Sequence, residues 1–108
     1  MAHAHLDGTA IGGWDAFHEQ CAAVFGFPAF YGRNMNAWID CLTYVRDGDG
    51  MSRFVLGPEE PLVIELSGAK TLKSQLPEIV DALVECTVAV NARHVEMGEQ
   101  PALLLLLH

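Results

Sequence analysis

The feature that most constrains the fold is a long helical pattern set between two short apolar runs. Apolar residues at helical spacing predict a helix over residues 77–97, and Gly98 suits its C-terminal cap. The run 62–66 before it and the run 103–107 after it are too short for helices and predict buried strands. Two strands joined by a helical crossover lie parallel in one sheet, because the crossover carries the chain back to the same end.

The first part of the chain predicts a third strand and the remaining helices. Residues 2–6 form a short mixed strand before a turn. An apolar stripe that begins at Trp14 predicts a helix over residues 14–25. Asn34 is a good N-cap for a second helix over residues 35–45, and residues 67–76 predict a short helix after the second strand.

The order of these elements predicts a single α/β domain over residues 1–108. Four short helices cannot easily cover both faces of a three-stranded parallel sheet. We therefore expect two layers, with the helices mostly on one side of the sheet. The last helix has a wide apolar face that includes Val84 and Val88, and we expect this face to be largely buried. Residues 46–60 predict a surface loop, with a short extended piece at residues 54–56.

Charge and cysteine usage narrow the class of partner and the compartment. The net charge is −8, which argues against direct binding of nucleic acid or of an anionic membrane surface and favours a basic protein partner. The chain has no apolar run near membrane-spanning length and no basic start followed by an apolar stretch, so we expect a cytoplasmic protein. Cys21, Cys41 and Cys86 are odd in number and lack close spacing, which predicts reduced thiols.

One group of histidines and one group of aspartates give weak indications of metal binding. His3 and His5 alternate as on one face of a strand, and His108 follows the last strand, but no acidic or cysteine partner lies at ligand spacing. The segment 47–50 has the Asp-Gly repeat of a calcium loop, but Glu59 falls one position late for its last ligand. We expect exposed polar residues in both places, with no metal and no cofactor.

One pair of residues has the types needed for nucleophilic catalysis. His18 precedes Cys21 by three residues, so both can share a helix face. A catalytic thiol needs an exposed and positive setting, whereas Cys21 lies on an apolar stripe of a helix that also carries acids. We therefore expect no catalytic residues and no enzymatic activity.

The second helix has a polar stripe next to an aromatic loop. Asn36, Asp40 and Thr43 recur at steps of four and three, opposite the apolar residues of the same helix. Taken alone, Asp40 can be either a solvated helix residue or a binding residue.

The segment over residues 27–43, FPAFYGRNMNAWIDCLT, resembles the signature of the barstar family, the intracellular inhibitors of barnase-type ribonucleases. The similarity extends back over the first helix and resumes at residues 61–65. It implies the family's two-layer fold. It also implies an inhibitor or immunity protein whose acidic second helix and preceding loop block a basic ribonuclease or nuclease toxin. The alternative is a barstar-fold binding or scaffold module with a non-nuclease partner.

The resemblance also implies which residues bind the partner. Four residues match family interface positions by identity, and four depart from the family's residue at such positions. The matches are Gly32, Asn34, Asp40 and Thr43, and the departures are Phe30, Asn36, Ile39 and Tyr44. Asn36 stands where the family inhibitor has a carboxylate. The candidates near the family's acidic contact on the later helix are Arg93 and Glu96, and Arg93 has the opposite charge. Residues 46–60 resemble an insertion beside this interface.

Overall fold

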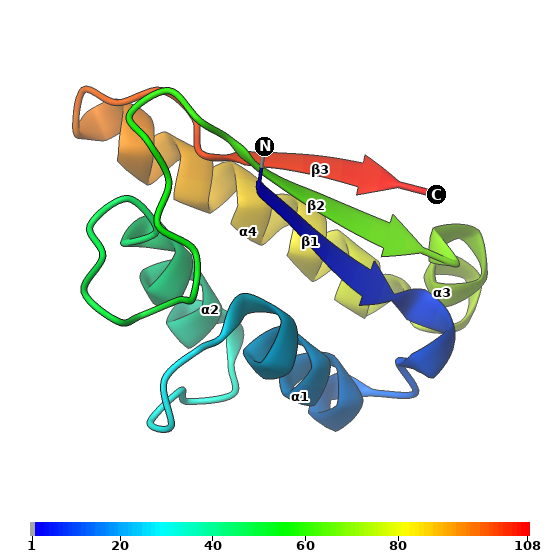
Figure 1. The fold of residues 1–108 in the computed structure, drawn as a ribbon. Coiled ribbons are helices and arrows are strands. Elements are labelled where there is room, and N and C mark those ends of the chain that lie inside the picture. Colours follow the sequence, from blue (N-terminus) through cyan, green and yellow to red (C-terminus); the bar gives the residue numbers. More distant parts are fainter. Residues whose placement is uncertain (1) are drawn as a thin grey trace.

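The computed structural model describes residues 2–108, and its elements alternate along the chain much as expected (Figure 1). One 3₁₀ turn, Gly8–Ala10, follows the first strand. The strands and helices are β1 (Ala2–Asp7), α1 (Trp14–Phe25), α2 (Met35–Thr43), β2 (Leu62–Ser67), α3 (Ala69–Gln75), α4 (Pro77–Glu96) and β3 (Leu103–Leu107).

The three strands form one parallel sheet in the order β1-β2-β3, which confirms the predicted fold class. Leu62 on the central strand lies opposite Ala2 on one side and Leu103 on the other. Helices make both crossovers, as parallel neighbours require. β1 and β3 are therefore the two edges of the sheet.

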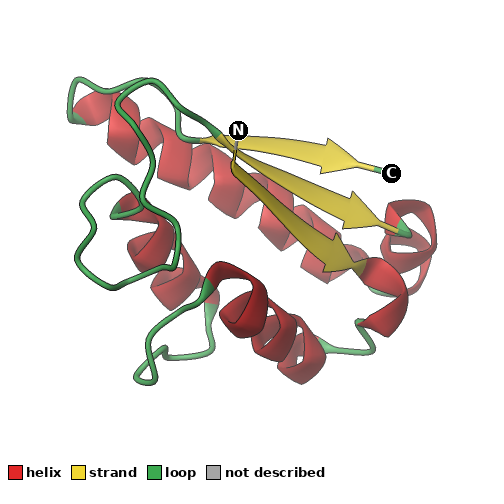
Figure 2. Cartoon of the chain, in the orientation of Figure 1, coloured by secondary structure: helices red, strands yellow, loops and turns green. Residues whose placement is uncertain are grey.

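The helices cover one face of the sheet, so the molecule has two layers (Figure 2). The hydrophobic core lies between these two layers. Its largest fully buried side chains include Trp38, Phe17, Phe25, Leu6, Leu42, Leu62, Ile64, Leu66, Ile79 and Leu83. Truncating any buried leucine here to alanine removes packed methyl groups and costs about 2–5 kcal/mol.

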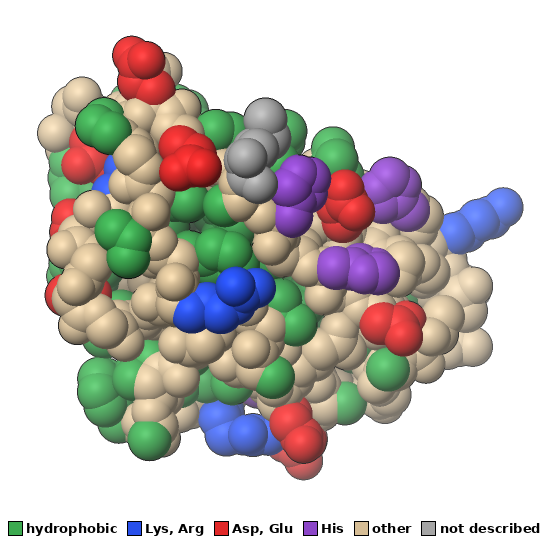
Figure 3. Space-filling model, in the orientation of Figure 1, with side chains coloured by type: hydrophobic (Ala, Val, Ile, Leu, Met, Phe, Trp, Pro, Cys, Tyr) green, Lys and Arg blue, Asp and Glu red, His purple; other side chains and the backbone are tan. Residues whose placement is uncertain are grey.

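The other face of the sheet carries polar side chains on β1 and β2 and the exposed Leu104 and Leu106 on β3. His3 and His5 alternate along β1 as expected, and each faces a neighbour on β2. His3 Nδ1 lies 3.7 Å from Glu65 Oε1, and His5 Nε2 lies 3.1 Å from Ser67 Oγ. Figure 3 shows the histidines gathered beside an acidic side chain on this side of the molecule.

The expectation that the wide apolar face of α4 would be largely buried is wrong for two of its valines. Val84 and Val88 of α4 are 39% and 63% exposed, because α4 packs on the sheet through the stripe that contains Leu83 and Val90. No strand lies beyond β3 in the described sheet, so the outer side of α4 has no cover. Trp14, at the first residue of α1, is 38% exposed.

The second helix is shorter than expected, and a structured loop follows it. α2 ends at Thr43, after which the amides of Tyr44 and Val45 bond back only three residues. The loop contains turns and no strand, and Leu56 within it is buried. Gly26 ends α1 in the left-handed conformation, with φ of 67°, and the loop passes close over it.

No helix among residues 2–108 combines the length and apolar character needed to cross a bilayer.

Candidate partner-binding surface

The loop before α2 presents an aromatic side chain to solvent and then starts the helix. Phe30 is 76% exposed. Asn34 is the N-cap: its Oδ1 accepts from the Ala37 amide at 2.8 Å, and its Nδ2 donates to the Gly32 carbonyl at 3.1 Å. An N-cap of this kind contributes about 0.5–2 kcal/mol to helix stability. Asn34 and Gly32 therefore shape the loop through their bonds to each other.

The same loop is anchored in the core by a buried polar pair. The Tyr31 hydroxyl lies 2.7 Å from His18 Nδ1 on α1, and both side chains are buried. Desolvation, with the charge of Arg33 second, lowers the pKa of His18, and burial raises the pKa of Tyr31. The hydrogen bond between this neutral pair joins α1 to the loop and fixes the position of the loop. Phe30 therefore projects from a well-anchored segment.

The polar stripe of α2 does not lie wholly in solvent. Asn36 and Asp40 are exposed, as is Tyr44 just after the helix, and Ile39 is half-buried. Thr43 is buried, which corrects the expected stripe. Its Oγ1 donates to the Ile39 carbonyl at 2.7 Å, and the side chain lies against α4 rather than beside Asp40 on an open face.

An arginine from α4 meets the central carboxylate. Arg93 Nη1 donates to Asp40 Oδ1 at 2.7 Å and to Thr43 Oγ1 at 3.3 Å. Both charged side chains are about half exposed, 46% for Arg93 and 56% for Asp40. The contact uses Oδ1 only, and no hydrogen bond within residues 2–108 uses Oδ2. Asp40 is thus partly neutralised on one side and open on the other.

The loop after α2 carries a negative charge within electrostatic reach of Cys41. The pKa of the Cys41 thiol is raised, first by burial and then by the charges of Asp40 and Asp49. Sequence reasoning treated Asp49 only as part of a solvated turn.

Buried polar contacts hold that loop in place. Arg46, whose side chain is 5% exposed, donates to the carbonyls of Gly57, Glu60 and Gln100 at 2.6–3.1 Å. It also lies 3.6 Å from Glu99 Oε1, and the same carboxylate oxygen is 2.7 Å from His94 Nδ1. His94 is fully buried, with Nε2 3.3 Å from the Leu42 carbonyl of α2. The loop, α2 and the end of α4 are therefore joined in one network.

The residues weighed for catalysis and metal binding have other surroundings. Burial raises the pKa of the Cys21 thiol to about 12, so it stays protonated at neutral pH, and His18 is turned to Tyr31. All three cysteines are free thiols. Over residues 2–108, no three histidine, cysteine, aspartate or glutamate side chains converge as a metal ion requires.

Comparison with known proteins adds one finding. A family model described as Barstar (barnase inhibitor) matches residues 1–105. No curated protein matches the chain.

Proposed function

The chain belongs to the barstar family, and on that premise we propose that it is an intracellular inhibitor or immunity protein that blocks a basic ribonuclease or nuclease toxin. It acts by binding, without catalysis and without a cofactor. The contacting surface consists of the exposed residues of α2 and of the loop before it, with Asp40 at its centre. A chain of net charge −8 attracts a basic enzyme over distance and favours rapid association.

The observation that carries this proposal is the setting of Asp40. Its carboxylate is 56% exposed and has Oδ2 free of hydrogen bonds within residues 2–108. An arginine or lysine that holds RNA phosphate can approach that open side. Phe30, exposed on a loop that is anchored from beneath, supplies an apolar contact beside the charges.

The Arg93–Asp40 contact also favours the second candidate, a binding module with a non-nuclease partner. A guanidinium and a carboxylate side by side suit a partner that presents both signs of charge, rather than a purely cationic pocket. For a nuclease, the partner's cation has to share the carboxylate with Arg93.

The test is inhibition of RNA cleavage by a purified barnase-type ribonuclease, together with calorimetric binding to the same enzyme. We expect inhibition at stoichiometric amounts, and Asp40→Ala should weaken binding by about 2–5 kcal/mol, because the variant leaves the enzyme's cation unpaired. Asp81→Ala is the matched control. Asp81 lies on α4 near the end opposite Arg93, is a similarly exposed carboxylate, and pairs with Lys73 of α3. Normal binding by Asp40→Ala would remove the inhibitor assignment for this face, and loss in both variants would show a general charge effect.

A further inference from the structure

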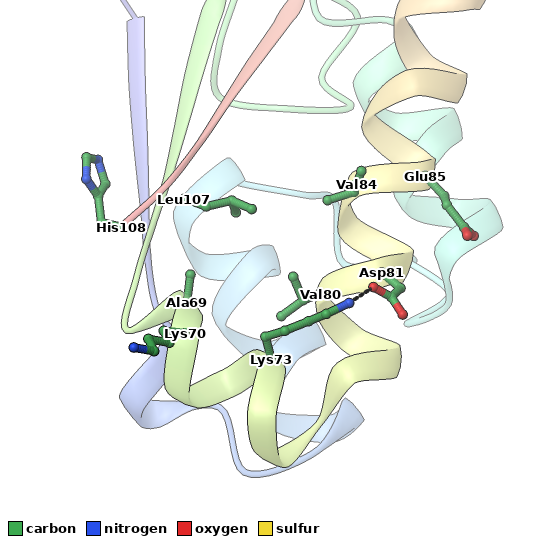
Figure 4. A pocket seen from close by; sticks show the side chains of 9 residues that line it. All are labelled: Ala69, Lys70, Lys73, Val80, Asp81, Val84, Glu85, Leu107 and His108. Atoms are coloured by element: carbon green, nitrogen blue, oxygen red, sulfur yellow. Dashed lines mark hydrogen bonds and ion pairs between the residues drawn. The ribbon is translucent and has the colours of Figure 1, made fainter.

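Exposed apolar side chains concentrate on one edge of the molecule, away from α2. Of the eleven large hydrophobic residues that are exposed among residues 2–108, seven lie on β3, on α4 or at its cap. Leu107 of β3 is 48% exposed on the helix side of the sheet, near Val84 of α4, and Leu106, 36% exposed, lies on the opposite face. A groove of about 480 Å³ runs between the end of β3 and the start of α4, and Figure 4 shows Leu107, Val80 and Val84 around it. An apolar edge of this kind is usually covered in solution.

The backbone of β3 has unpaired groups on this edge. In a parallel pair, alternate residues of a strand bond to its neighbour. The bonds from Leu62 N to Ala102 O and from His108 N to Leu66 O show that the even-numbered residues face β2. Leu103, Leu105 and Leu107 therefore direct their amides and carbonyls outward.

One of these three residues already has a partner. The Asn91 side chain of α4 accepts from the Leu103 amide at 2.8 Å and donates to its carbonyl at 3.0 Å. No outward hydrogen bond reaches Leu105 or Leu107 from the part of the chain that the structure describes. Asn91 thus closes one end of the edge and leaves two residues, with four backbone groups, open to another strand.

We propose that β3 pairs with β3 of a second copy of this chain, antiparallel about a two-fold axis at Leu106. In that register Leu105 of each copy lies opposite Leu107 of the other, and all four open groups on each strand are paired. The two Leu106 side chains then face each other across the axis, as a closely spaced pair without backbone bonds. The three-stranded sheet becomes one six-stranded sheet.

The charge of the groove favours a second copy over a basic protein. Lys70, Lys73, Asp81 and Glu85 line it, and their formal charges cancel, although the whole chain carries −8. Lys73 and Asp81 also pair with each other within one copy, as Figure 4 shows. Two such neutral surfaces meet without net repulsion at the contact, whereas a basic partner gains nothing from this edge.

The exposed side of α4 fits the same axis. α4 runs antiparallel to β3, with Val80 and Val84 near Leu107 and Asn91 near Leu103. A two-fold axis at Leu106 therefore brings the Val84 region of one helix toward that of the other. The valines left exposed beneath the sheet then cover each other.

Sedimentation equilibrium of the purified chain tests whether this dimer exists. We expect a mass about twice the 11.8 kDa of the chain at high concentration, falling toward the single-chain mass on dilution. Leu106→Lys should shift this equilibrium at least tenfold toward the monomer, since two ammonium groups meet at the axis. Val55→Lys, at a 64% exposed loop position outside this edge, is the control and should leave the equilibrium unchanged. A single-chain mass up to the solubility limit, or equal loss of dimer in both variants, overturns the proposal.

Cysteine cross-linking tests the register. Diamide, which accepts the two thiol hydrogens, should join two copies of Leu106→Cys through one disulfide, because residues opposed at the axis lie within disulfide reach. Leu104→Cys is the matched control on the same face of β3, where the two copies' residues are offset by four positions, or about 13 Å. Cross-linking of Leu104→Cys as fast as Leu106→Cys contradicts the register. A dimer formed without any cross-link in Leu106→Cys contradicts the pairing itself. Neither result bears on inhibition through α2.

Discussion

Arg93 of α4 and Asp40 of α2 form an ion pair at 2.7 Å, although 53 residues separate them in the chain. The pair places a positive charge beside the carboxylate that is central to the proposed inhibitor surface. It sets the balance between attraction and repulsion that a basic partner meets there.

Removing that arginine should improve binding of a basic nuclease. We expect Arg93→Ala to tighten the complex by about 1 kcal/mol and to change the free energy of unfolding by about 0–1 kcal/mol, because an exposed pair contributes little to stability. In the Asp40→Ala background the same change should recover part of the lost affinity. Calorimetric titration of the four proteins of this cycle is the measurement. Weaker binding by Arg93→Ala means that the partner uses the guanidinium, as the non-nuclease candidate requires.

Restoring a carboxylate at Asn36 should help both the helix and the complex. Asn36 is exposed in the first turn of α2, which has no acidic residue. Asn36→Asp should stabilise the protein by about 0.3–1 kcal/mol through the helix dipole, and binding to a barnase-type enzyme should be equal or tighter. Urea unfolding at low and high salt checks the first effect, which salt should diminish. Asn36→Lys is the opposite-charge control, and a stabilising effect of the same size from lysine would exclude the dipole as the cause.

The loop after α2 should depend on Arg46. Its buried guanidinium satisfies three backbone carbonyls, so Arg46→Met should cost about 3 kcal/mol or more in unfolding free energy. Arg53→Met is the control, because the exposed Arg53 side chain donates to one carbonyl, Val24 O, and should cost about 1 kcal/mol. Chemical denaturation measures both. Equal effects would show that the loop is held mainly by its apolar residues.

Glu99 should make stability fall at acid pH. The hydrogen bond from His94, with weaker help from Arg46, holds the Glu99 pKa below its ordinary value of 4.5. A carboxyl with a lowered folded-state pKa stabilises the protein above its unfolded-state pKa, and that contribution is lost as the pH falls through the folded-state value. Glu99→Gln should therefore melt below the parent at neutral pH, with the gap closing in acid below pH 4.5. Melting curves across this range are the measurement, and a gap independent of pH would contradict the linkage.

Thiol accessibility should follow burial. Cys21 and Cys41 are 0% and 2% exposed, and Cys86 is partly buried. In the native protein, Cys86 should react first with an aromatic disulfide reagent. The unreduced, denatured chain should show three thiols, and a count of one would reveal a disulfide that the structure does not contain.

The sequence by itself determined the order and type of the elements. The run 103–107 gave a strand with the predicted bounds, and the apolar spacing over 14–25 gave α1 with the predicted bounds. The FPAFYGRN segment and the Asp-Cys-Leu-Thr that follows were sufficient to identify the family, which the family model confirms. These features are local, because side-chain period, caps and glycines act within a few residues.

Only the tertiary structure decided what each face of a helix meets. The spacing of α4 predicted that Val84 would be covered, but the sheet ends at β3 and leaves it exposed. The spacing of α2 put Thr43 beside Asp40, but the packing of α4 buried the threonine and brought Arg93 onto the carboxylate. A helical period tells which residues share a face. The charge and the cover opposite that face come from elements distant in the chain, whose positions are set by the packing of the whole core.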